Sequence, residues 1–200
     1  MSFGYKNWDP KLDQALKRAR DHDIVIFAAA SNFGNHEQVA WPARDPERAI
    51  CVHSSIDLGT DCSEFTPKAH SGTINFMAVG ERVCSHWPVS KDGGFRTMSG
   101  TSTATPVATA IAALLLAFTR QTVVNKEKKK DVEDEIGPVR LQELWSMRAL
   151  LKHICTEVGN YYWIRPHLLW SQYEPTKMQE KDPGAPTKYA WEEIRRALRR

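Results

Sequence analysis

A continuous apolar run at residues 24–30 constrains the fold of this chain more than any other segment. It begins with β-branched residues and carries no charge, which is typical of a strand buried on both faces of a parallel sheet. A helix is expected directly before it, because Asp9-Pro10 is a helix start and apolar residues follow with helical spacing. Those apolar residues are Leu12, Ala15, Leu16 and Ala19. A helix followed at once by a buried strand indicates an α/β layer fold.

The same alternation continues along the chain. Two further strands are expected at residues 49–53 and 74–79, joined by a polar connection. A helix is expected over residues 100–118, and its centre is apolar all round, which predicts a helix buried on every side. Helical spacing resumes at residues 141–154.

Shifts in composition predict four segments. Residues 1–120 form the main α/β unit, and residues 121–140, which are dense in charges, form a surface loop. Residues 141–170 form a C-terminal helical part of the same domain. Residues 171–200 form a polar tail that ends in a basic helix. That terminal helix either docks on the body without a separate function or serves a partner or membrane surface, and its partner is unknown.

The composition excludes several kinds of partner and cofactor. The 200 residues include 27 Lys and Arg and 24 Asp and Glu, so there is no electrostatic reason to expect a nucleic-acid partner. The cysteines Cys51, Cys62, Cys84 and Cys155 lack the paired spacing of a zinc site, and Cys84 with His86 is the nearest approach. We therefore expect free thiols, no metal site and no cofactor.

We expect no secretory signal in these residues, because residues 1–6 are followed by polar residues and not by an apolar h-region. The longest apolar stretch, at residues 107–118, is shorter than the roughly 20 residues that cross a bilayer. We expect a soluble protein without a membrane span. The compartment is left open, with the cytoplasm favoured.

Ser102 lies at the start of the apolar helix. A serine nucleophile needs one group to take its proton and another to hold the developing oxyanion. The first turn of a helix supplies unpaired N–H groups and the positive end of the helix dipole. Gly100 permits a tight turn and close approach of a substrate. The simpler interpretation of Ser102 is a helix N-cap.

Asn32 follows the buried strand, and ligands of open α/β sheets bind at the carboxyl ends of strands. Its amide is therefore a candidate for the same site. Taken alone, Asn32 would be interpreted as a turn residue.

Together these segments resemble the subtilisin-like serine proteases (peptidase S8). G-T-S-T-A-T-P at residues 100–106 resembles the family's nucleophile motif G-T-S-x-A-x-P, and A-A-S-N at residues 29–32 is similar to A-A-G-N. W-P-A at residues 41–43 before I-C-V at residues 50–52 resembles Y-P-A and I-A-V. F-M-A-V-G at residues 76–80 resembles M-A-P-G, and M-S-F-G at residues 1–4 resembles M-S-[LF]-G. All five occur in the family's order, and residues 141–169 resemble its C-terminal helices more weakly.

The resemblance implies a fold, a three-layer α/β sandwich around a parallel sheet, of which this chain would hold the second half. It also implies catalytic roles: Ser102 attacks the scissile carbonyl, and its N–H and the Asn32 side chain hold the oxyanion. Residues 2–4 would pair with the substrate backbone. Residues 29–31 would form part of the wall around the substrate residue that precedes the scissile bond. The implied substrate-binding residues are Ser2, Phe3, Gly4, Ala29, Ala30, Ser31, Gly100 and Thr101.

The general base is missing from the expected pattern. The family's D-[ST]-G and H-G-T segments precede its M-S-F-G strand, so their places lie before residue 1. None of the seven histidines is followed by Gly-Thr. The histidines are His22, His36, His53, His70, His86, His153 and His167.

Two functions of different classes follow from the sequence. The first is a subtilisin-type serine endopeptidase that acts on peptide or protein substrates, represented by an incomplete chain that is inactive alone. The second is a catalytically inactive remnant that binds peptides or a partner through the former substrate cleft and the basic tail. Substrate preference and physiological target are not given by the sequence.

Overall fold

The computed structural model describes residues 1–56, 59–122, 141–174 and 182–199. The predicted loop at residues 121–140 therefore lies almost wholly outside the described residues. The helices are α1 (Pro10–Asp21), α2 (Thr101–Thr122), α4 (Leu144–His153) and α5 (Ala185–Leu198). The strands are β1 (Phe27–Ala29), β2 (Ile50–Ser55), β3 (Phe76–Val79), β4 (Val83–His86), β5 (Phe95–Met98), β6 (Cys155–Val158) and β7 (Tyr161–Ile164).

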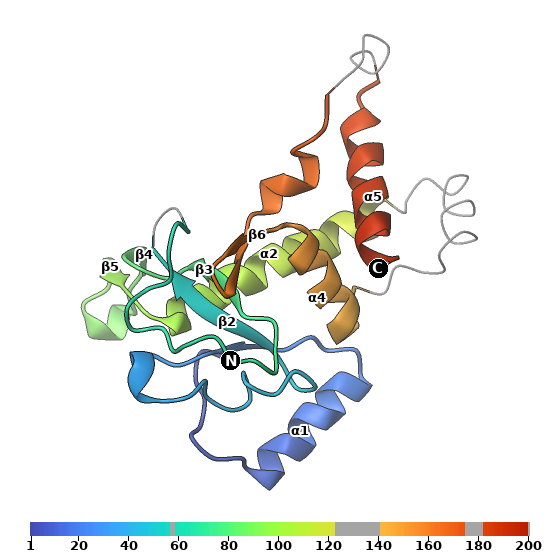
Figure 1. Ribbon diagram of the computed structural model, residues 1–200. Coiled ribbons are helices and arrows are strands. Elements are labelled where there is room, and N and C mark those ends of the chain that lie inside the picture. The colour runs from blue at the N-terminus through green and yellow to red at the C-terminus, as the bar shows by residue number, and fades with distance from the viewer. Residues whose placement is uncertain (57–58, 123–140, 175–181, 200) are drawn as a thin grey trace.

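The main sheet has the strand order β1-β2-β3-β7-β6 (Figure 1). Strands β1, β2, β3 and β7 run parallel, and β6 pairs antiparallel with β7. In register, Ala28 lies opposite Cys51, and Val52 lies opposite Phe76. This mostly parallel sheet with packed helices confirms the predicted α/β fold class.

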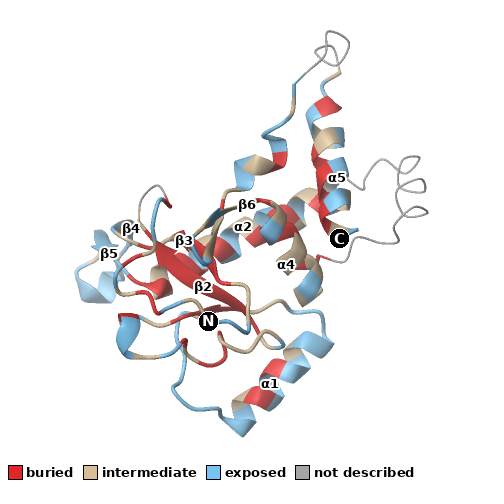
Figure 2. Cartoon of the chain, in the orientation of Figure 1, coloured by how far each residue is buried: buried red, intermediate tan, exposed pale blue. Residues whose placement is uncertain are grey.

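Residues on β2 alternate between two buried clusters, as the two-residue period of a strand requires. Ile50 and Val52 join the larger cluster with α2, α4 and α5, whereas Cys51 joins a smaller one with Val39 and Ala43. Figure 2 shows that buried residues are concentrated along β2 and recur along α2. The β2 strand is therefore buried on both faces along its whole length, although its second half carries the polar residues His53, Ser54 and Ser55.

Helix α1 begins where the sequence predicts. The Asp9 side chain accepts a hydrogen bond from the Leu12 N–H at 2.8 Å, and proline occupies the first turn. On the buried face, Arg48 Nε donates to Asp13 Oδ1 at 2.5 Å. This hydrogen bond holds the pKa of Asp13 below its usual range and ties α1 to the segment before β2.

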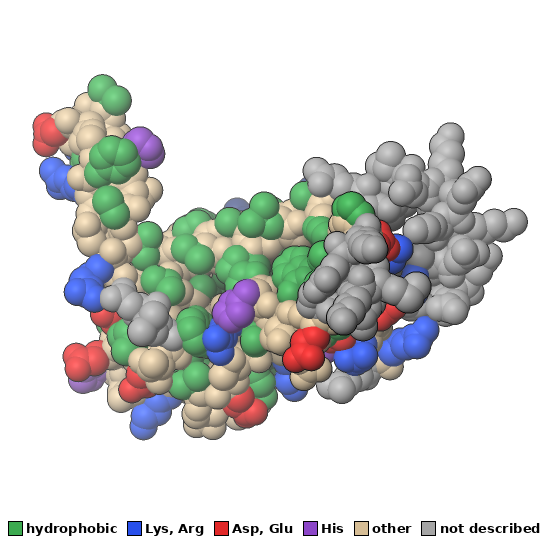
Figure 3. Space-filling model, turned by 90° about the horizontal axis from the view of Figure 1, so that it is seen from above, with side chains coloured by type: hydrophobic (Ala, Val, Ile, Leu, Met, Phe, Trp, Pro, Cys, Tyr) green, Lys and Arg blue, Asp and Glu red, His purple; other side chains and the backbone are tan. Residues whose placement is uncertain are grey.

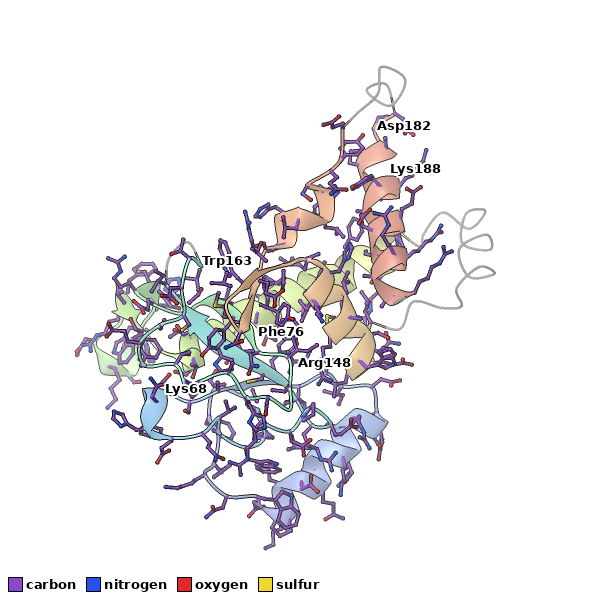
Figure 4. The ribbon with its side chains drawn as sticks, in the orientation of Figure 1. Lys68, Phe76, Arg148, Trp163, Asp182 and Lys188 are labelled. Carbon is purple, nitrogen blue, oxygen red and sulfur yellow. The ribbon has the colours of Figure 1, made fainter. Side chains whose placement is uncertain are left out.

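Arg148 makes the matching connection between α4 and that segment. Its Nη2 donates to the carbonyls of Pro46 at 2.5 Å and Ala49 at 3.4 Å (Figure 4). Burial lowers the pKa of Arg148 from its ordinary value. The entrance to β2 is therefore fixed from two helices.

Two sequence-based expectations need correction. Strand β1 begins at Phe27 and not at residue 24, because Ile24 is 58% exposed and Val25 and Ile26 are only partly buried. Helix α2 is not buried on every side. Its residues Ala110, Ala113, Leu114 and Ala117 are exposed, and Leu114 is 71% exposed. Hydrophobic side chains also spread over much of the surface seen from above (Figure 3).

The C-terminal part is only partly helical. The expected helix is present as α4, but residues 155–164 form the hairpin β6–β7, whose second strand joins the main sheet. The terminal helix α5 is present, and its buried face packs on α4. Asp182 and Lys188, 2.5 Å apart, lie near its beginning (Figure 4).

The remaining expectations concern membranes, metals and thiols. The length of the apolar stretch at residues 107–118 led us to expect no membrane span. The whole helix α2 is nevertheless long and apolar enough to cross a membrane, judged by length and composition alone. A core helix of a soluble protein passes the same test, and α2 packs against β2 and β3. No cluster of metal-ligating side chains is found among the described residues. All four cysteines are free thiols, with Cys51 buried and Cys84 exposed.

Candidate active site

A tethered turn places Ser102 at the first turn of α2. The Gly100 N–H donates to the Gly80 carbonyl at 2.8 Å, which joins the turn to the end of β3. The Thr103 hydroxyl lies 2.8 Å from the Gly80 carbonyl and 2.7 Å from the Gly100 carbonyl. Ser102 therefore sits on rigid backbone at the carboxyl end of the sheet, where parallel strands place ligand sites.

The side chain of Asn32 faces Ser102 from the end of β1. Its Oδ1 accepts hydrogen bonds from the Thr101 N–H at 2.7 Å and from the Thr101 hydroxyl at 3.0 Å. Because a backbone N–H can only donate, the amide is oriented with Nδ2 on the opposite side. No acceptor for Nδ2 lies within the part of the chain that the structure describes.

Gly100 leaves the space between these two side chains open. A Cβ at this position would lie 3.0 Å from Ser102 Oγ and 3.1 Å from Asn32 Nδ2. The φ angle of Gly100 is +157°, a backbone conformation that side chains rarely adopt. Ser102 and Asn32 therefore face each other across a space about the size of a methyl group.

The Ser102 backbone N–H opens onto the same turn. Its neighbours are paired, since the Thr103 N–H donates to the Gly100 carbonyl at 3.0 Å. Among the described residues the Ser102 N–H has no acceptor, as expected for the first turn of a helix. An amide N–H, a backbone N–H at a helix start and a hydroxyl are the groups that can hold an oxygen that gains negative charge.

A cleft of about 740 Å³ extends from Ser102 along the segments before α1 and after β1. It brings together most of the residues predicted from the sequence: Ser2, Phe3, Gly4, Ala29, Ser31, Asn32, Thr101 and Ser102. Ala30 is a correction, because it is fully buried in the cluster on the other side of the strand and does not line the cleft. Gly100 contributes the open space and not a lining side chain.

The sequence interpretation missed a second group of lining residues, which we call the outer half of the cleft. Its further lining residues are Tyr5, Lys6, Asn7, Phe33, His36, Glu37, Gln38, Ala40 and Arg44. Most of them directly follow a motif segment, but no local pattern distinguishes them from loop residues. The cleft is formed where these loops meet, as in the bridge between Tyr5 and Trp41.

The histidines lie elsewhere or reach only the rim. His36 lines the cleft, whereas His53 is fully buried in β2, with its Nε2 3.1 Å from Asn75 Oδ1. Burial lowers the pKa of His53 to about 4. His153 pairs with Glu193 at 2.9 Å. Within the described residues, no hydrogen bond joins a histidine to Ser102.

The structure thus brings a serine and an asparagine together at the carboxyl end of a mostly parallel sheet, beside a cleft. Residues 1–162 match the Subtilase family (Peptidase S8). The chain therefore belongs to the subtilase family.

Relatives and solved structures agree with this assignment. The chain is 38% identical to the subtilisin-like protease het-Q2 of Podospora anserina, over 99% of this chain and 56% of that protein. It is 27% identical to the major intracellular serine protease of Bacillus subtilis, over 66% of this chain and 40% of that protein. The chain thus spans about half the length of these curated relatives.

Among solved structures, the fold is similar to that of a cold-adapted subtilisin-like serine proteinase. The TM-score is 0.58 at 26% identity, over 83% of this chain and 53% of that one. The prenylagaramide maturation protease PagA gives a TM-score of 0.62 at 18% identity, over 97% of this chain and 60% of that one. At that identity the second likeness shows the fold alone.

Proposed function

We propose that this chain supplies the nucleophile and oxyanion hole of a subtilisin-type serine endopeptidase. The observation that best supports the proposal is the placement of Ser102 Oγ and Asn32 Nδ2 about 3 Å from one point that only a glycine at position 100 leaves open. Ser102 and Asn32 both line the cleft of about 740 Å³, so a bound peptide can reach that point.

In the proposed reaction, Ser102 Oγ attacks the peptide carbonyl carbon while a general base takes its proton. The carbonyl π electrons move to oxygen, and the Ser102 N–H and Asn32 Nδ2–H donate to the resulting oxyanion. Collapse of this intermediate expels the amine, which takes the proton from the base. Water then hydrolyses the acyl-enzyme by the same steps, and Ser102 is regenerated.

We further propose that the base histidine and its orienting aspartate are supplied by sequence outside these 200 residues. No described histidine is hydrogen-bonded to Ser102, and the relatives are longer than this chain. On this proposal the 200 residues alone hydrolyse peptides far more slowly than a complete protease.

The test compares the 200-residue chain with a form extended upstream of Met1. Reading the coding sequence in frame for D-[ST]-G and H-G-T segments identifies that form. We expect the extended form to cleave a generic peptide library and to lose turnover in Ser102→Ala, whereas Ser71→Ala, an exposed-loop control, retains it. Turnover by the short form that depends on Ser102 would instead indicate a base within the chain, with His36 the first candidate.

The second candidate function is a non-catalytic peptide-binding module. It is favoured by the lack of a described partner for the Ser102 hydroxyl. An upstream coding sequence without the Asp and His segments, together with peptide binding that Ser102→Ala leaves intact, would support it.

A further inference from the structure

The outer half of the cleft carries an unbalanced positive charge. Lys6, His36, Glu37 and Arg44 line the same cavity as Ser102. Lys6 Nζ lies 3.4 Å from Glu37 Oε1, so these two charges compensate each other. Arg44 has no carboxylate partner within the described ranges of the chain. One guanidinium charge therefore remains in a cavity that opens onto Ser102.

The Arg44 guanidinium is held in place by backbone carbonyls. Its Nη2 donates to the Lys6 carbonyl at 3.0 Å, and its Nη1 donates to the Val39 carbonyl at 3.5 Å. Carbonyl groups accept hydrogen bonds without neutralising the charge. A guanidinium has five N–H donors, so most remain unused by the protein. A fixed, partly buried arginine with free donors has the geometry that binds carboxylates in a bidentate manner.

We propose that Arg44 selects peptides with an acidic side chain, Asp or Glu, at the position that reaches the outer half of the cleft. This inference rests on the proposed function only in that the cleft binds a peptide. Ser102 and Arg44 line the same cavity, so a peptide whose carbonyl lies at Ser102 can place one of its side chains against the guanidinium. The carboxylate then supplies the charge partner that the folded chain lacks.

A purely structural role for Arg44 predicts different behaviour. If Arg44 only ties the segment at residue 6 to the loop at residue 39, its loss would lower stability and weaken all peptides equally. A role in recognition changes the ratio between acidic and neutral peptides. The ratio is therefore the quantity to measure.

The experiment uses Ser102→Ala, so that no peptide is cleaved, and fluorescence anisotropy of labelled octapeptides. The peptides form matched pairs that differ by Asp against Asn, or Glu against Gln, at one position at a time. We expect one position at which the acidic peptide binds about 10- to 100-fold tighter, the range for a charge-assisted hydrogen bond. Arg44→Gln should bring that ratio to about one, and Arg44→Glu should favour Lys at the same position.

Arg18→Gln is the control for net charge, because Arg18 lies on exposed α1 away from the cleft. It should leave the ratio unchanged. A ratio near one at every position overturns the inference, as does a preference that persists in Arg44→Gln or a failure of every peptide to bind. The first two outcomes leave the proposed chemistry untouched, whereas a failure of every peptide to bind also counts against the cleft as a peptide site. The chemistry itself is judged separately, from turnover that depends on Ser102.

Discussion

The Thr101 N–H donates a 2.7 Å hydrogen bond to Asn32 Oδ1, across 69 positions of sequence. The fully buried Thr101 hydroxyl lies 3.0 Å from the same oxygen and 3.2 Å from the Ser31 carbonyl. One residue of α2 thus orients the amide at the end of β1, and the free Nδ2 faces Ser102. Thr101 is therefore a positioning residue for Asn32, a role that its place in the motif does not reveal.

Removal of the Thr101 hydroxyl should loosen this orientation. In an active, extended form, we expect Thr101→Val to lower kcat about three- to tenfold, the worth of one neutral hydrogen bond, with KM unchanged. Thr101→Ser retains the hydroxyl and should restore most of the rate. A wild-type rate in Thr101→Val, with a loss only in Thr101→Ser, would show that the threonine methyl group, and not its hydroxyl, is what matters.

Ser31 is expected to be strained. Its φ is +130°, a region that favours glycine, and its buried Oγ has no hydrogen-bond partner among the described residues. Ser31→Gly should therefore stabilise the fold by about 1 kcal/mol, after the entropy cost of glycine is subtracted. The measurement is the midpoint of urea unfolding, with Ser71→Gly in an exposed loop as the control. A lower midpoint for Ser31→Gly than for Ser71→Gly would contradict the assignment of strain.

Because His53 is buried, we expect the folded protein to lose stability in mild acid. Burial lowers its pKa to about 4 in the folded protein, whereas an unfolded histidine titrates near its ordinary value of 6.5. Below pH 6.5 the unfolded state binds the extra proton, so stability falls as the pH falls towards 4. The total loss is about 3 kcal/mol.

The unfolding free energy of wild type and His53→Gln should be compared between pH 7 and pH 4. The substitution should flatten this dependence, whatever its own cost in stability. His22→Gln removes an exposed histidine and should retain the wild-type slope. A slope that survives in His53→Gln would assign the effect to another group.

The exposed apolar face of α2 predicts self-association of the 200-residue chain. Leu114 is 71% exposed among exposed alanines, and contiguous apolar surface favours association. In sedimentation velocity, we expect concentration-dependent oligomers that Leu114→Gln reduces. Val89→Gln, at a residue 91% exposed beside β4, is the matched control and should have no effect. A wild type that stays monomeric at all concentrations would contradict this prediction.

The fold was predictable where local sequence and burial agree. The cap at Asp9 fixes the start of α1, and the apolar run at residues 24–30 locates β1 although not its first residue. The β6–β7 hairpin was missed although Gly159-Asn160, with Gly159 at φ +58°, is a two-residue hairpin signal between Val158 and Tyr161. The exposed face of α2 could not be predicted, because an apolar sequence does not show which of its sides has a neighbour.

The residues of the candidate site were likewise only partly predictable from the sequence. Ser102 and Asn32 could be predicted as candidates because each lies in a motif at the end of an element, and the structure brings the two together. Arg44 was missed because its place in the cleft depends on hydrogen bonds to the carbonyls of Lys6 and Val39. Lys6 is distant in sequence, and Val39 belongs to no recognised motif. Ala30 was misassigned because the alternation of side chains along a strand turns it away from the cleft.

The central claim is that Asn32 acts on the oxygen of the carbonyl that Ser102 attacks. The most direct measurement is kcat per titrated active site for Asn32→Ala in a form that carries the general base. Because the amide donates to an oxygen that is charged only in the transition state, kcat should fall by about 10²–10³, the loss known for this donor in subtilisin itself. KM should stay within about threefold. An unchanged kcat per titrated site, with only a loss of stability, would contradict the account and leave Asn32 as a turn residue.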